Sequence, residues 1–89
     1  MRETKVENEV VAMVKLMGGM CLKWVSPGFT GVPDRIIMLP GGRIIFAEIK
    51  APGEKPRPRQ KRVHDQLRGL GFKVMVIDDA DKFWEEVSR

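Results

Sequence analysis

The chain has 89 residues, a length that fits one domain with a modest hydrophobic core. Its net charge of +4 favours a polyanionic partner without requiring one. No apolar run approaches the ~20 residues of a membrane span, and the N-terminus lacks the layout of a secretory signal. A single cysteine and a single histidine exclude an internal disulfide and a zinc site made of Cys and His ligands. We therefore expect one cytoplasmic domain, residues 1–89, without a membrane partner.

A first helix is predicted over residues 4–17 and ends at Gly18-Gly19. Its apolar residues recur at steps of three and four and form one face: Val6, Val10, Met13, Val14 and Met17. Glu7 projects into this apolar sector, where a carboxylate needs a partner. Either Thr4 and Glu7 form a capping box at the start of the helix, or Glu7 points at a functional site.

Three strands are predicted next, over residues 20–25, 34–39 and 43–50. The loop before the second strand carries Phe29, which we expect to tuck into the core. The second and third strands form a hairpin around Pro40-Gly41-Gly42. The third strand is apolar on both faces, which is typical of a covered central strand.

This hairpin gathers charged residues at one end of the sheet. Strand alternation puts Glu48 and Lys50 on the same face. A three-residue loop would place Asp34 opposite Glu48, whereas a two-residue Gly-Gly loop would place Asp34 opposite Ile49. The sequence leaves the choice between the two loops open.

A Pro- and Gly-rich loop over residues 51–58 leads into a second helix over 58–70. The predicted inner face of this helix consists of Val63, Leu67 and Leu70, with Gln60 on the same face in the first turn. Gln60 either bonds backbone at the edge of the core or holds a water or a phosphate. His64 lies at the margin of this face, and we interpret it as structural.

The last two elements are a strand over residues 72–77 and a helix over 80–87. Asp78-Asp79 can cap this helix, and we expect Phe83, Trp84 and Val87 to pack inward. The order of elements is therefore αβββαβα. It predicts a small α/β domain in which a mixed sheet is flanked by helices.

The charged residues at the end of the hairpin suit metal-assisted hydrolysis. Asp34 and Glu48 offer the hard oxygen ligands that Mg²⁺ or Mn²⁺ requires, and the backbone carbonyl of Ile49 lies beside them. Glu7 is a third candidate ligand, direct or through water. Lys50 can orient or activate an attacking water and stabilise developing charge. Each feature alone is also an ordinary turn or ion pair, but their conjunction on adjacent strands points to catalysis.

A run of basic residues follows this predicted site and favours phosphate binding. The candidate contacts are Lys55, Arg57, Arg59, Lys61 and Arg62, with Arg35 beside the aspartate.

The chain resembles the PD-(D/E)xK nuclease superfamily and, more narrowly, the stand-alone, phage-type VRR-NUC domain. The segments that carry the resemblance cover most of the chain: Gly19–Trp24, Gly31-Val32-Pro33-Asp34-Arg35, Gly41-Gly42-Arg43, Phe46 to Gly53, and Arg57-Pro58-Arg59-Gln60. The resemblance implies a restriction-endonuclease-like core and a metal-dependent DNA endonuclease. It implies that Asp34 and Glu48 bind metal and that Lys50 is catalytic. It also implies that Glu7 matches the glutamate of the first helix and that Gln60 matches the glutamine after the core motif.

Free-standing members of this kind are associated with homodimers that cut branched DNA such as four-way (Holliday) junctions, in the host cytoplasm if phage-encoded. Related modules in repair proteins act on flaps, so a flap or general DNA nuclease is the alternative. A basic DNA-binding module without catalysis is the rival of a different class. Symmetric cutting requires two sites related by a two-fold axis. The candidate dimer surfaces are the apolar residues of the first helix and the strand over 20–24.

Overall fold

The computed structural model describes residues 2–88 of the chain. Its elements are α1 (Glu3–Leu16), β1 (Met20–Lys23), β2 (Arg35–Leu39), β3 (Arg43–Ile49), α2 (Pro58–Gly69), β4 (Lys73–Ile77) and α3 (Ala80–Val87). The predicted order and the α/β class are confirmed, although the strands begin or end one or two residues inside the predicted ranges. Among residues 2–88, no helix combines the length and apolar character needed to cross a membrane.

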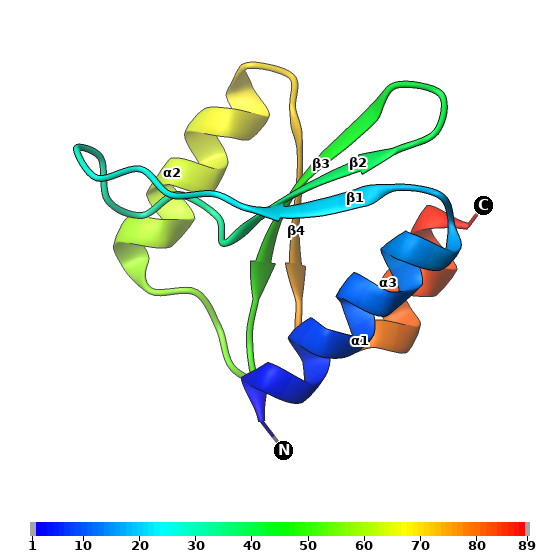
Figure 1. Cartoon of the computed structure of the whole chain (residues 1–89). Coiled ribbons are helices and arrows are strands. Elements are labelled where there is room, and N and C mark those ends of the chain that lie inside the picture. The colour runs from blue at the N-terminus through cyan, green and yellow to red at the C-terminus, as the bar shows by residue number, and fades with distance from the viewer. Residues whose placement is uncertain (1, 89) are drawn as a thin grey trace.

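The four strands form one mixed sheet in the order β1-β2-β3-β4. The first three strands are antiparallel, and β4 runs parallel to β3 after the crossover through α2. Helix α2 covers one face of the sheet, while α1 and α3 lie together on the other (Figure 1).

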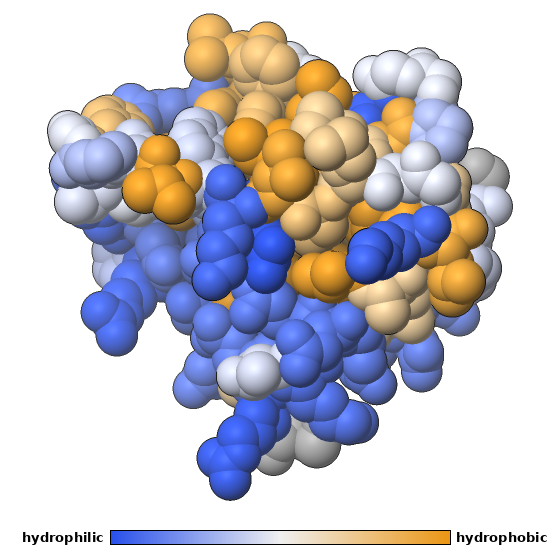
Figure 2. Space-filling view, in the orientation of Figure 1, coloured by the Kyte–Doolittle hydropathy of each residue, from blue (hydrophilic) through white to orange (hydrophobic). Residues whose placement is uncertain are grey.

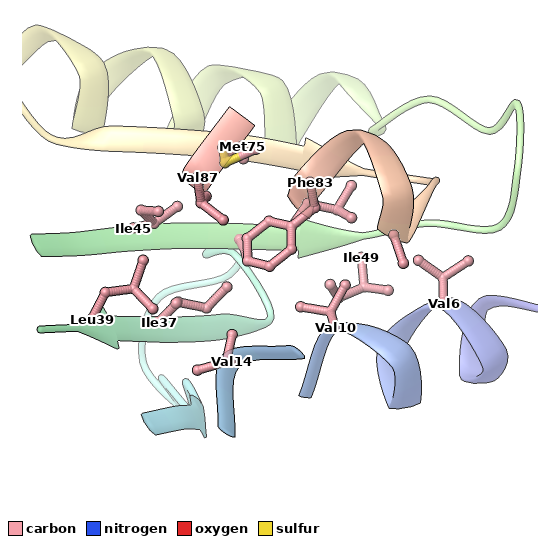
Figure 3. Close-up of a cluster of buried hydrophobic side chains, with 13 residues drawn as sticks. Val6, Val10, Val14, Ile37, Leu39, Ile45, Ile49, Met75, Phe83 and Val87 are labelled. Atoms are coloured by element: carbon pink, nitrogen blue, oxygen red, sulfur yellow. The ribbon is translucent and has the colours of Figure 1, made fainter. Parts of the chain in front are cut away.

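The main hydrophobic core lies between the sheet and the α1–α3 pair (Figure 3). Val6, Val10 and Val14 are all buried there, so the apolar face predicted for the first helix points into the protein. Alternate residues of β2 and β3, such as Ile37 and Ile45, meet this face from the sheet.

The β2–β3 register resolves the choice between the two hairpin loops. Leu39 pairs with Arg43 and Arg35 pairs with Ala47, so the loop has three residues. Gly41 and Gly42 adopt φ angles of +85° and +76°, which only glycine takes without strain. Continued by one residue, this register places Asp34 opposite Glu48.

Gly31 allows the segment before β2 to lie against α2. Its φ angle is +92°, and a Cβ atom there would lie 3.0 Å from Val63 Cγ2 and 3.2 Å from the carbonyl oxygen of Arg59. Glycine therefore allows both the turn and the close approach. The chain then passes through the buried Pro33 to Asp34.

Several local predictions are wrong. Arg2 is the N-cap of α1 and no side chain caps this helix, so Thr4 and Glu7 form no capping box. Phe29, Leu70 and Trp84 are 47%, 74% and 40% exposed, although we expected them to face inward. Leu70 lies just past the end of α2, and Phe29 lies in a turn.

The prediction for the cap of α3 is confirmed. The Asp79 carboxylate accepts hydrogen bonds from the backbone N–H groups of Asp81 at 2.9 Å and Lys82 at 3.3 Å. Phe83 and Val87 are buried as predicted, and Trp84 lies outside the face that they share.

Candidate active site

Backbone contacts at the junction of three strands position Asp34. Its carbonyl oxygen accepts a hydrogen bond from the Trp24 backbone N–H at 2.9 Å, which extends the β1–β2 ladder. Its carboxylate accepts a bond from the Ile49 backbone N–H at 2.9 Å across the hairpin. Asp34 is therefore held against the end of β3.

Glu48 is the most unusual residue at this end of the sheet, because its carboxylate is buried and its side chain is 2% exposed. Three side chains surround it. The Gln60 amide donates to Oε2 at 3.0 Å, the Lys50 Nζ lies 3.6 Å from the same oxygen, and the His64 Nε2 lies 3.3 Å from Oε1. Within the described chain, every buried polar side-chain atom has a hydrogen-bond partner.

Burial raises the pKa of Glu48 from 4.5 to about 7. The second cause is the neighbouring carboxylate of Asp34, and the Lys50 ammonium opposes the rise. Two carboxylates are thus held together where water screens them poorly. Such an arrangement favours a proton or a cation between them.

Gln60 connects α2 to the site through both ends of its amide. Its oxygen accepts a bond from the Arg57 backbone N–H at 2.9 Å, which caps the start of the helix, while its nitrogen donates to Glu48. Gln60 therefore makes the predicted bond to backbone and also contacts an acidic residue of the site.

His64 is a site residue that the sequence reasoning treated as structural. It is 1% exposed and contacts Glu48. Burial is the main cause that lowers the pKa of His64, and the positive charge of Arg68 is the second. The neutral ring can donate its Nε2–H to the carboxylate. The available signal was its spacing, because residues four apart lie on the same side of a helix and His64 follows Gln60 by four.

Glu7, on α1, lies near Asp34. Both residues line a cavity of about 240 Å³ together with Trp24. The Arg35 Nε donates a hydrogen bond to the Glu7 Oε2 at 3.0 Å. The partner that this carboxylate needs is therefore an arginine of β2.

Arg35, an expected DNA contact, has a structural role in this arrangement. Besides Glu7 it binds the carbonyl oxygen of Cys21 at 3.1 Å, and its side chain is only 14% exposed. Arg35 is therefore held within the fold, unlike the other expected DNA contacts. The remaining candidates are exposed: Lys55, Arg57, Arg59, Lys61 and Arg62.

The donor atoms at the site suit a hard divalent cation. Asp34 and Glu48 present carboxylate oxygens next to each other, and their mutual repulsion is one reason for the raised pKa of Glu48. Within residues 2–88, no three Asp, Glu, His or Cys side chains are grouped so that they could hold a metal ion by themselves. Magnesium and manganese fit this set, because they commonly take one or two carboxylates and complete their coordination with water and substrate phosphate.

The chain is similar to known proteins in both sequence and structure. A scan against models of protein families gives no match. A protein of Acyrthosiphon pisum secondary endosymbiont phage 1 named "Putative nuclease p44" is 52% identical over 80 residues, which cover 90% of this chain and 86% of that protein. A solved structure of a "VRR_NUC domain" superposes with a TM-score of 0.90 at 30% identity and covers 98% of this chain and 95% of its own.

Proposed function

The chain belongs to the VRR-NUC family of nucleases, and we propose that it is a metal-dependent endonuclease that cuts branched DNA such as four-way junctions. A nuclease that prefers flaps or has no structural preference is the alternative within the same chemistry. We also propose that it acts in the cytoplasm of a bacterial host, because its relative at 52% identity comes from a phage of a bacterial endosymbiont.

The observation that carries the proposal is the buried Glu48 carboxylate between Asp34 and Lys50. A carboxylate that is 2% exposed beside a second carboxylate is costly to ionise. An apolar side chain at this position would give a more stable fold. A catalytic role in binding a cation explains why the strand carries Glu48.

We propose that Asp34 and Glu48 hold Mg²⁺ or Mn²⁺, with the backbone carbonyl of Ile49 as a further oxygen ligand. Glu7 would act through a water in the cavity that it lines with Asp34, because its carboxylate is already paired with Arg35. A bound divalent ion would supply a water of lowered pKa and offset charge on the scissile phosphate.

The protein's own groups then orient the reaction. Lys50 presents its ammonium 3.6 Å from Glu48, where it can direct the attacking water and stabilise charge that develops on the phosphate. Gln60 and His64 each hold one oxygen of the Glu48 carboxylate and so fix its orientation. The exposed cations of the 51–58 loop and of α2 would bind neighbouring phosphates of the DNA.

The test is cleavage of a panel of four-way junction, flap, duplex and single-stranded DNA with and without Mn²⁺, by wild type and by Lys50→Ala. We expect metal-dependent cutting that is strongest on the junction, unchanged DNA binding by Lys50→Ala, and a loss of activity of at least about 100-fold in that variant. Cleavage by Lys50→Ala at the wild-type rate would contradict the mechanism. Lys82→Ala is the control, because it removes an exposed lysine of α3, which lies on the face of the sheet opposite α2 and outside the DNA-binding candidates.

The rival interpretation is a DNA-binding module that performs no catalysis. It predicts that calorimetric titration with Mn²⁺ gives no binding that depends on Asp34. The nuclease proposal predicts one binding event in wild type that Asp34→Asn removes. No heat of binding in wild type, together with no cleavage of any DNA, would favour the rival.

We propose a homodimer, because one chain carries one site and symmetric cutting of two strands needs a pair. The apolar face of α1 is buried, so the first of the two predicted surfaces is not available. The strand surface remains: Met20 and Leu22 of β1 are 55% and 43% exposed. Hydrophobic residues gather over the upper half of the face in Figure 2, and hydrophilic residues dominate its lower half. Sedimentation of wild type and Leu22→Asp would test this surface, since the variant should be monomeric.

A further inference from the structure

A large apolar hollow opens beside the candidate active site and has no role in the chemistry described above. Its volume is about 580 Å³, within the range of about 300–1,000 Å³ that is typical of ligand sites. Two polar residues, Ser26 and Gln66, lie in its wall. The apolar lining residues are Trp24, Phe29, Val32, Val63, Leu67 and Leu70.

The edge of this hollow is positively charged. The Arg59 guanidinium lies 6.0 Å from the centre of the Phe29 ring and donates a hydrogen bond to the Thr30 hydroxyl, which anchors it there. Arg62 is exposed on the neighbouring turn of α2, and none of the eight lining residues is acidic. A ligand that suits both features has a flat apolar face and an attached anion.

The hollow adjoins the catalytic residues through shared elements. Trp24 lines both the hollow and the cavity that contains Asp34. On α2, Val63 lines the hollow, and the next residue, His64, contacts Glu48. A nucleotide seated in the hollow would therefore place its neighbouring backbone close to the acidic residues.

We propose that the hollow binds an unpaired nucleobase of the DNA substrate, stacked on Phe29, with the adjoining phosphate on Arg59. Every base offers an aromatic face, so such a site would recognise an exposed base without reading its sequence. Gln66 and Ser26 can bond to the edge of the base. This inference rests on the proposed function, because it explains how a small nuclease could distinguish a branch point from intact duplex.

Charge argues against a second copy of the chain as the occupant. A two-fold related copy docked here would bring the exposed Arg59 and Arg62 of one chain against those of the other, and these like charges would repel. DNA brings the opposite charge to the same place. Loss of self-association in a variant of the hollow, with DNA binding intact, would mean that the hollow is a protein interface and would overturn the proposal.

The test removes either the base or the aromatic ring and measures DNA affinity in EDTA, where no cleavage occurs. An abasic nucleotide is moved through the branch point of a flap or junction, one position at a time, and each DNA is bound to wild type and to Phe29→Ala. We expect one position at which loss of the base weakens wild-type binding by about tenfold or more. Phe29→Ala should bind all of these DNAs equally. Without the ring the stacking contact is already absent, so removal of the base should have no further effect.

Three controls make the result specific. Phe29→Trp should restore the response to the abasic position, because it restores an aromatic face. Leu16→Ala removes an apolar side chain that is 83% exposed outside the hollow and should behave like wild type. Phe29 is itself 47% exposed, so its truncation should leave the unfolding temperature nearly unchanged. Leu70→Ser provides a second variant in the lining of the hollow.

The outcomes separate this inference from the proposed function. If wild type cuts branched DNA but no abasic position matters, the base site is wrong and the nuclease assignment stands. If one position matters to wild type and not to Phe29→Ala, but no DNA is cut with Mn²⁺, the base site stands and the endonuclease proposal fails. An equal loss of duplex and branched binding in Phe29→Ala would overturn the base site.

Discussion

Ionisation of Glu48 should make the metal-free protein less stable as the pH rises. Its pKa is raised to about 7 in the folded protein from 4.5, chiefly by burial and then by Asp34. A group whose pKa is raised on folding favours the folded state below its unfolded pKa, and this contribution is lost as the pH rises through the folded pKa. The window for Glu48 is therefore about pH 4.5 to 7.

The magnitude follows from the same values. One pKa unit corresponds to about 1.4 kcal/mol, so a rise from 4.5 to about 7 corresponds to about 3 kcal/mol above pH 7. This is a large part of the stability of a small domain. Glu48→Gln keeps the shape of the side chain and an acceptor oxygen but removes the ionisable group.

We expect the free energy of unfolding of Glu48→Gln minus that of wild type to rise by about 3 kcal/mol between pH 4.5 and 8, measured with urea in EDTA. Adding Mn²⁺ at pH 8 should stabilise wild type by mass action and leave Glu48→Gln unaffected. The control is Glu9→Gln, which removes an exposed carboxylate paired with Lys5 at 3.6 Å and should show no such rise. A difference between Glu48→Gln and wild type that stays constant with pH would refute the reasoning.

Two further predictions concern the residues that support the site. Gly31→Ala should destabilise the protein by roughly 1–3 kcal/mol, measured by urea unfolding, because the residue has a positive φ and a Cβ would meet Val63; a stability equal to wild type would contradict the role given to this glycine. His64→Leu should weaken Mn²⁺ binding about 10–100-fold in calorimetry, because Glu48 loses a partner. His64→Gln should recover most of that loss through its amide N–H, and equal effects of the two substitutions would mean that His64 only fills space.

The order of elements could be predicted because it depends on local patterns. The three- and four-residue steps of Val6, Val10 and Val14 specify a buried helix face wherever the helix packs. The alternation of Glu48 and Lys50 places both on one face for the same reason, and the ion pair between them agrees with it. The cap formed by Asp79 likewise involves only its near neighbours.

Predictions failed where the outcome depended on how distant elements meet. Glu7 could bond to its own helix or to another element, and Arg35 from β2 is its partner. Phe29 is apolar, yet the loop turns it toward an open hollow. His64 looked like a marginal helix residue because nothing local reveals that α2 lies over the buried end of β3.

The sequence by itself therefore determined the elements, the polar residues at the hairpin and the strand alternation that joins Glu48 to Lys50. Only the tertiary structure decided that the turn has three residues, that Asp34 meets the end of β3, and that α2 supplies both Gln60 and His64 to one carboxylate. The physical reason is range. Periodicity acts over one turn or one strand, whereas the pKa of Glu48 depends on the burial and the charges that arise when separate elements pack together.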